Sequence, residues 1–134
     1  MTFVHGKNTF ISLNAVNLST FCNTSNLGRT SDSHDVTTYG RDEHVYTGGL
    51  KDGTSSIGGI YDNTAGTGPR PTIEPLIGTV VTLIRRVEGT GSGKPQNSVS
   101  VLVTNYVETN PVADMITWTA ELQLSGPVNN AAQP

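Results

Sequence analysis

The chain has 134 residues, of which 34% are hydrophobic and 14% are charged, with 15 glycines and a formal net charge of −3. This length supports a single compact domain, and the composition favours thin β-sheet layers with many turns over helices. The acidic balance leaves no basic surface for attracting nucleic acid phosphates, and the single cysteine excludes both an intrachain disulfide and thiolate-based metal sites.

The N-terminal part is predicted to be β structure. Residues 9–13 form a short strand, and residues 14–17 form a turn, because asparagine tolerates the positive backbone angles of tight turns. An apolar connector covers residues 18–21. Residues 23–36 are polar throughout but have β-tolerant threonine and serine spacing, so part of this segment is assigned to an exposed or edge strand.

Residues 36–62 carry the most informative pattern. A β-prone stretch ends at Tyr39, a turn and a second irregular stretch at 48–53 follow, and an alternating run covers residues 54–62. The sequence therefore predicts two strands joined by a long polar loop over residues 39–53. Because loops of this length are usually functional or disordered, this one is predicted to leave the domain and contact a neighbouring subunit. The predicted contact residues are Gly40, Arg41, Asp42, Glu43, Gly49, Lys51 and Asp52.

The next segment predicts the one helix. Residues 66–71 break the strand pattern with glycines and prolines, and residues 72–77 can form one or two helical turns. Thr72 is the expected N-cap, since a threonine oxygen accepts a hydrogen bond from a free amide of the first turn.

Three strands are predicted in the C-terminal half. They cover residues 79–84 with an extension to 88, residues 97–107 and residues 115–124, and a glycine-rich hairpin loop joins the first two. Strand side chains alternate between faces, so each strand has an apolar and a polar face. The predicted core residues are Leu83, Val99, Val101, Val103, Ile116, Trp118, Leu122 and Leu124, and Trp118 is assigned to the core rather than to a sugar-stacking platform.

The motifs that could carry chemistry are weak. The glycines of residues 89–94 suggest a phosphate loop, but a Walker-type loop needs glycine at Glu88 and Ser or Thr at Pro95, and no helix follows. Cys22 follows Phe21 in an apolar patch and is interpreted as a small buried hydrophobe rather than a nucleophile. No catalytic residue and no cofactor is predicted.

An acidic and histidine-containing region raises the question of a cation site. Its spacing matches no known ligand pattern, so a solvated acidic loop is the favoured interpretation. The residues concerned are His34, Asp35, Asp42, Glu43 and His44.

Several of these segments together resemble a known family. The pattern runs from Val36-Thr-Thr-Tyr-Gly40 through Gly49-Leu50 and Asp52-Gly53 to Gly59, Tyr61 and Asp62, and the likeness extends to residues 3–7 and 111–126. It resembles the major tail (tail tube) proteins of siphophages that infect actinobacteria. The resemblance implies an all-β, tail-tube-like β-sandwich or barrel with one short helix and a long inter-strand loop. Residues 1–126 would form the tail tube β domain and residues 127–134 a flexible C-terminal tail.

The resemblance also implies a function. Such a protein polymerises into stacked hexameric rings that form a DNA-conducting tube, and it is a structural virion component rather than an enzyme. Its implied partners are further copies of itself, the tape measure and tail terminator proteins, and double-stranded DNA that passes without specific binding; no membrane partner is expected. Assembly would take place in the host bacterial cytoplasm, and the final location would be the virion tail.

The polar face of the last strand is the candidate for the channel wall. It contains hydroxyl, amide and carboxylate groups but no Lys or Arg, so phosphates would not adhere to it. The lumen candidates are Thr117, Thr119, Glu121 and Gln123. Two other classes of protein stay open: another virion component, such as a capsid decoration or tail terminator protein, and a β-sandwich that binds carbohydrate or cell wall.

Overall fold

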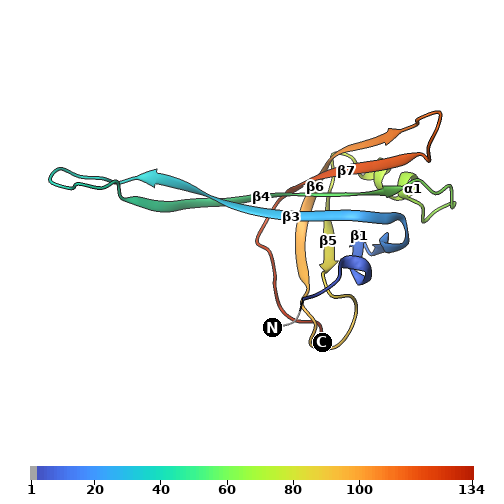
Figure 1. The fold of residues 1–134 in the computed structure, drawn as a ribbon, viewed down its shortest axis with the longest axis horizontal. Helices are drawn as coiled ribbons and strands as arrows, with labels where there is room; N and C mark the ends of the chain where they lie inside the picture. Colours follow the sequence, from blue (N-terminus) through green and yellow to red (C-terminus); the bar gives the residue numbers. More distant parts are fainter. Residues whose placement is uncertain (1–2) are drawn as a thin grey trace.

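The computed structural model describes residues 3–134, and Figure 1 shows that a bent antiparallel sheet dominates this part of the chain. Its seven strands lie in the order β2-β1-β5-β6-β7-β4-β3. The strands are β1 (Phe10–Leu13), β2 (Val16–Asn17), β3 (Cys22–Asp35), β4 (Tyr46–Ile60), β5 (Val80–Arg86), β6 (Asn97–Thr109) and β7 (Thr117–Leu124). The helical elements are α1 (Pro69–Ile73) and the 3-10 turns η1 (Gly6–Asn8), η2 (Ser19–Phe21) and η3 (Glu74–Leu76).

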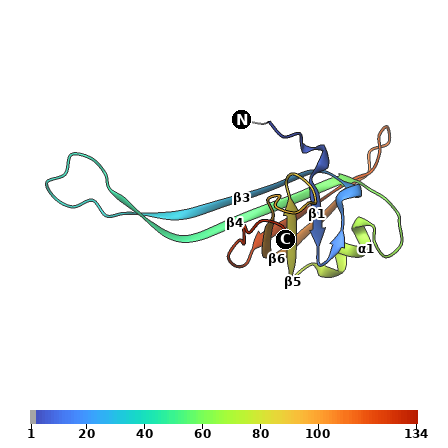
Figure 2. The ribbon, with the colours of Figure 1, turned by 90° about the horizontal axis from the view of Figure 1, so that it is seen from below.

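The sheet bends at β6. The first part of β6 pairs with β5, its second part pairs with β7, and a register shift separates Val103 from Asn105. Such bulges bend a strand and increase its twist. As a result β1 and β5 run across the direction of β3 and β4 (Figures 1 and 2), and the concave side of the bent sheet surrounds the core.

The core confirms most of the predicted positions. Buried apolar side chains come from both halves of the sheet, from the β2–η2 connector and from α1: Ile11, Leu13, Leu18, Ile57, Ile73, Leu83, Val99, Val101, Val103, Trp118, Ala120 and Leu122. Leu124 is half-buried and packs against them. The prediction for Ile116 is wrong, because β7 begins one residue later and Ile116, which is 38% exposed, lies beyond the end of the core.

The first hairpin confirms the predicted turn at Asn14 and Ala15, but Val16 and Asn17, predicted as part of the turn, form β2. Asn14 and Ala15 have φ values of 52° and 66°, and Leu13 pairs with Val16 across the two-residue loop. Two positive φ values are the geometry that matches the right-handed twist of the flanking strands.

β4 begins much earlier than the sequence suggests. The prediction of an irregular stretch at 48–53 is wrong, because these residues continue the ladder between β3 and β4. Two of the glycines permit close approach instead of bends: a Cβ on Gly49 would lie 2.5 Å from Nε2 of His34, and a Cβ on Gly53 would lie 2.5 Å from the carbonyl oxygen of Gly28. The polar segment 23–36, assigned in part to an edge strand, supplies β3 at one edge of the sheet.

The helix is present but starts earlier than predicted. Gly68 is the N-cap of α1, Pro69 follows it, and Thr72 is a buried residue inside the helix, so the expectation that Thr72 is the cap is wrong. Proline suits the first helical turn because its missing N–H has no partner there anyway. Nε and Nη2 of Arg70 donate to Oε1 of Glu108, at 2.8 and 2.5 Å, and fix α1 to β6. Within residues 3–134 no helix is long and apolar enough to cross a membrane.

The C-terminal segment returns along the body to the glycine-rich loop. Asn129 forms a two-bond bridge with Ser98, and Gln133 is buried against the loop. The Gln133 side chain accepts from the amide of Gly91 at 3.0 Å and donates to the carbonyl oxygen of Gly89 at 2.8 Å. Gln133 therefore has a buried position that the polar composition of residues 127–134 did not indicate, while the flexibility of this segment stays a prediction.

Candidate functional site

A two-stranded arm is the most prominent feature of the molecule (Figures 1 and 2). We use this name for residues 29–53, the distal parts of β3 and β4 with their connecting loop. β7 pairs with β4 only from Thr54 to Ile60, so beyond Gly53 no other described strand flanks the ribbon. All residues from 28 to 44 are exposed. An isolated two-stranded ribbon without a packed face is only marginally stable in water.

The tip of the arm is the loop over residues 36–45, and its turn is held by side chains. Oδ1 of Asp35 accepts hydrogen bonds from the amide and the hydroxyl of Thr37, at 2.9 and 2.5 Å. The Thr37 hydroxyl oxygen in turn accepts from the amide of Val45 at 2.8 Å. The Thr37 hydroxyl holds the pKa of the Asp35 carboxyl below its usual value, with smaller contributions from the Thr37 amide and His44. The Asp35 and Thr37 side chains thus close the base of the tip loop.

The predicted contact residues fall into two groups. Gly40, with φ of 85°, lies in the tip with Arg41, Asp42 and Glu43, and all four are exposed. The loop spans residues 36–45 instead of 39–53, so the assignment of three further residues to it is wrong: Gly49, Lys51 and Asp52 belong to β4, nearer the body. For both groups, contact with a neighbouring subunit stays a prediction.

The histidine and acidic residues near the tip are mostly separate. His44 Nδ1 lies 3.4 Å from Oδ2 of Asp35, and both side chains are largely exposed. Within residues 3–134 no group of three or more His, Cys, Asp or Glu side chains is placed to hold a metal ion. The structure therefore gives only a hydrogen-bonded pair at this position.

A polar surface covers the outer face of the β7-β4-β3 half of the sheet. Thr117, Thr119 and Glu121 are exposed there, and Glu121 lies beside Ser56 in the ladder. The same face continues with Thr54 on β4 and with Thr24 and Asn26 on β3. None of these positions carries Lys or Arg, and we call this surface the polar face.

Gln123 differs from the other lumen candidates. It is half-buried, and its amide nitrogen donates to Oδ1 of Asp52 at 2.7 Å and to the carbonyl oxygen of Gly53 at 2.8 Å. Its side chain therefore fixes the point where the arm leaves the body. Sequence reasoning missed this role because the two partners are about seventy residues away along the chain.

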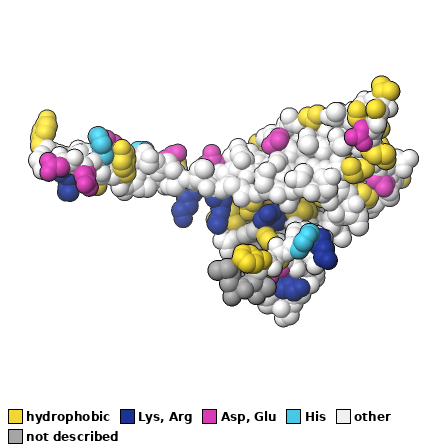
Figure 3. All heavy atoms as spheres, in the orientation of Figure 1, with side chains coloured by type: hydrophobic (Ala, Val, Ile, Leu, Met, Phe, Trp, Pro, Cys, Tyr) yellow, Lys and Arg dark blue, Asp and Glu magenta, His cyan; other side chains and the backbone are white. Residues whose placement is uncertain are grey.

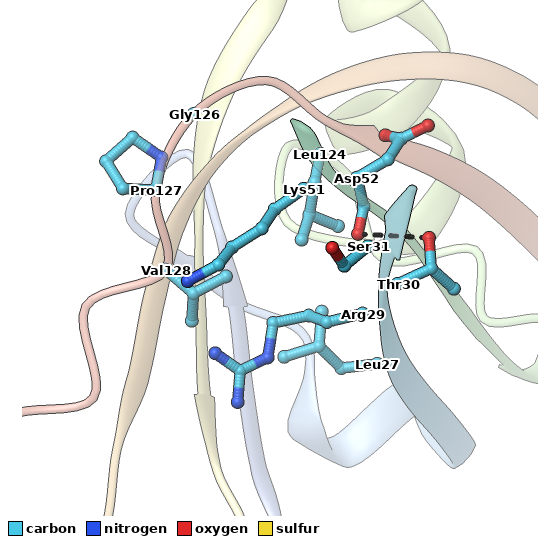
Figure 4. Close-up of a pocket in the computed structure, with 10 residues that line it drawn as sticks. All are labelled: Leu27, Arg29, Thr30, Ser31, Lys51, Asp52, Leu124, Gly126, Pro127 and Val128. Atoms are coloured by element: carbon cyan, nitrogen blue, oxygen red, sulfur yellow. Dashed lines mark hydrogen bonds between the residues drawn. The ribbon is translucent and has the colours of Figure 1, made fainter. Parts of the chain in front are cut away.

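A groove of about 850 Å³ lies at the root of the arm, between the arm and the C-terminal segment (Figure 4). We call it the root groove. Arg29 and Lys51 extend along it beside Val128, and Figure 3 shows basic side chains beneath the arm where it leaves the body. Leu27 and Leu124 add apolar surface. Lys51 is one of the contact residues predicted from the sequence; Arg29 is not among them, because the register that places it beside Lys51 is not visible in the sequence.

Apolar side chains are exposed at both ends of the long axis (Figure 3). Tyr39 is fully exposed at the tip of the arm. At the opposite end, the connection between β6 and β7 exposes Val112 and Met115.

Cys22 is not a reactive thiol. It is half-buried and packs against the core, and burial raises the pKa of its thiol to about 12. A thiol with that pKa stays protonated at neutral pH and does not act as a nucleophile.

Comparison with known proteins gives matches only at the level of structure. No protein family profile and no curated protein matches the chain. A chain of the virion of a native gene transfer agent (GTA) particle superposes with a TM-score of 0.80 at 12% identity, covering 97% of this chain and 100% of that one. The SPP1 tail tube has the same fold, so the chain has a tail tube fold.

Two further structures agree with this assignment. A chain from the tail of an empty GTA particle with C6 symmetry has a TM-score of 0.76 at 12% identity, with 97% of this chain and 100% of that chain covered. The SPP1 tail tube has a TM-score of 0.76 at 9% identity, with 98% of this chain and 80% of that chain covered. The fold is thus mainly antiparallel β with one short helix, as predicted.

Proposed function

We propose that this protein is the major tail protein of a siphophage-type particle of the actinobacteriophage kind. It assembles into hexameric rings, and the rings stack into a tube that conducts double-stranded DNA. The observation that carries the proposal is the tail tube fold over nearly the whole chain, since 98% of the chain is covered by the match to the SPP1 tail tube at a TM-score of 0.76. The long arm adds a means of contact between copies.

The sheet provides the means of closing a ring. β3 is an edge strand of 14 residues, and β2 ends the sheet on the other side. The free edge of β3 offers backbone N–H and C=O groups along its length, which pair readily with a strand of another chain. Pairing between neighbouring copies would make the six sheets continuous and form the wall of the tube.

The polar face is the surface we assign to the lumen, with Thr117, Thr119 and Glu121 exposed on it and Gln123 at its border with the arm. Hydroxyl and amide groups keep the surface hydrated, while the single carboxylate repels phosphates. DNA would therefore pass without being held.

The role is mechanical and requires neither catalysis nor a cofactor. The tube would enclose a tape measure protein during assembly and would end at a tail terminator protein. Assembly would take place in the cytoplasm of the host bacterium, and the mature protein would be located in the virion tail.

Electron microscopy of the purified, concentrated protein tests the proposal. We expect hollow filaments of uniform width built from rings with sixfold symmetry. Single rings that never stack would indicate a tail terminator protein, and dispersed monomers or trimers would indicate a capsid decoration protein or a carbohydrate-binding domain. Either result would contradict the proposed function.

Replacing Glu121 with Lys is expected to leave tube assembly intact and to slow DNA ejection, most strongly at low salt. The new cation would lie on a face without other Lys or Arg residues and would attract passing phosphates, an attraction that salt screens. Fluorescence measurement of DNA release from virions that carry the variant checks this. Glu121→Gln is the matched control and should eject close to the wild-type rate; unchanged ejection by Glu121→Lys virions would place this face outside the lumen.

The C-terminal residues 127–134 are expected to be cleaved by a broad-specificity protease in the monomer and protected in assembled tubes. Gln133 anchors the segment to the loop at Gly89 and Gly91, but most of the residues before it are exposed. Mass spectrometry of the products measures cleavage, and Gln133→Ala should increase it in the monomer. Equal cleavage in monomers and tubes would show that the segment does not pack on a neighbouring copy.

A further inference from the structure

The root groove is lined by basic and apolar side chains, so it is suited to a ligand that is anionic and partly apolar. Arg29 and Lys51 are both exposed, and neither forms an ion pair with a residue that the structure describes. Asp52, the acidic residue of the lining, is hydrogen-bonded by the Gln123 side chain and the Gly53 amide. The two cations are therefore free to bind carboxylates from another molecule.

The arm tip has the complementary composition. Asp42 and Glu43 are exposed and form no ion pair within residues 3–134, and Tyr39 is fully exposed in the same loop, which also carries the exposed Arg41. Tyrosine and arginine are both enriched where proteins contact each other, because they combine apolar area with hydrogen bonding. The groove volume of about 850 Å³ is sufficient for a tyrosine ring and two carboxylates.

The tip cannot reach the groove of its own chain. The ladder from Arg29 opposite Gly53 to Asp35 opposite Tyr46 holds the arm extended, and the tip loop lies beyond it. At ~3.3 Å per residue the tip lies roughly 35 Å from Arg29. A contact between the two surfaces therefore needs a second copy of the chain.

We propose that the root groove binds the arm tip of a second copy. Tyr39 packs on Leu27, Leu124 and Val128, and the carboxylates of Asp42 and Glu43 pair with Arg29 and Lys51. Such a contact joins two different surfaces, and in a stacked tube it repeats from copy to copy in one direction, as a head-to-tail contact does when the rotation between copies does not close a ring. This inference rests on the proposed function and names the surface that receives the arm as the tube lengthens.

Charge reversal tests the pairing. The tip variant carries Asp42→Lys and Glu43→Lys, and the groove variant carries Arg29→Glu and Lys51→Glu. We expect each to reduce the protein in tubes by at least about tenfold at low salt, because like charges then meet in the contact. A control with Lys7→Glu and Lys94→Glu makes the same change in net charge as the groove variant but lies outside the groove, and it should assemble normally.

A second set of variants distinguishes loss of this contact from misfolding of the variant proteins. A chain with all four reversals, or a mixture of the tip and groove variants, should form tubes again because the opposite charges meet once more. Normal lengthening by the groove variant alone would overturn the inference while leaving the proposed function intact. Failure of both the four-reversal chain and the mixture to assemble would also overturn it.

Cross-linking gives a measurement that does not depend on tubes. A chain with Glu43→Cys and Lys51→Cys should give, on oxidation, ladders of three or more linked copies, because each copy offers one thiol at each surface. The Glu43→Cys chain is the control and should stop at dimers, since the native Cys22 is half-buried with a raised pKa. Cross-linked ladders without tubes would support binding of the arm tip in the root groove and contradict the proposed function. Tubes without ladders would contradict binding of the arm tip in the root groove.

Discussion

Replacement of residues 36–45 by a two-residue Asn-Gly turn is expected to lower the fraction of protein in tubes by about tenfold or more while leaving the domain folded. Asp35 and Tyr46 are directly paired, so a two-residue turn connects them without changing the register of β3 and β4. The body keeps its core, since none of the buried apolar residues lies in the removed segment. What is lost is the exposed tip with Tyr39, Asp42 and Glu43.

Electron microscopy and sedimentation would measure the fraction of protein in tubes, and we expect it to fall by about tenfold or more, as for other contacts centred on an aromatic anchor. A second variant, with residues 36–45 replaced by glycine and serine at equal length, keeps the reach of the loop and removes its chemistry. It should also fail to lengthen tubes. Normal tubes from the Asn-Gly variant would remove the arm tip from the stacking contact.

Replacement of Trp118 by alanine is expected to lower the free energy of unfolding by about 3–5 kcal/mol. Trp118 is 1% exposed, and its ring lies 6.1 Å from that of Tyr106 in a tilted arrangement. It lies on β7 between β4 and β6, and ladders on both sides prevent the strand from closing the cavity. A Cβ on the neighbouring Gly59 would lie 1.8 Å from the carbonyl oxygen of Phe21, so the chain around the cavity is already closely packed.

Urea denaturation of the monomer measures this change, at a concentration low enough to prevent assembly, because association adds to the apparent stability. Ile116→Ala is the matched control, since Ile116 precedes β7 and is 38% exposed. It should cost about 1 kcal/mol or less. A loss near zero for Trp118→Ala would mean that the indole is not part of the core.

The period of two in the apolar residues was sufficient to predict β5, β6 and β7. Leu83, the alternate valines of β6, Trp118 and Leu122 all face the core, because a strand covered on one side must place every second residue there. The pattern failed at Ile116, since alternation says which face a residue takes but not where the core ends. It also missed Ile11 and Ile73, which lie in short elements with too few residues to show a period.

The arm shows what the pattern could not determine. β3 and the first half of β4 are mostly polar, the first half of β4 is rich in glycine, and by composition such segments are loops. They are strands because each supplies the other with backbone hydrogen bonds. The glycines at 49 and 53 accommodate His34 and Gly28 from the opposite strand, a requirement that appears only once the register is known.

Of the two candidate surfaces, the polar face could be predicted from the sequence and the root groove could not. The absence of Lys and Arg from one face of residues 117–123 is a property of the sequence, since the neighbours on one face of a strand are set by its period of two. The root groove cannot be found in the sequence in this way, because its lining residues come from three parts of the chain: Arg29, Lys51, and Leu124 with Val128. The sequence alone determined how side chains alternate along each strand. Only the tertiary structure decided which strands pair, and with that pairing the arm and the root groove. The reason is that hydrogen bonds between distant backbone segments depend on register and not on local residue preference.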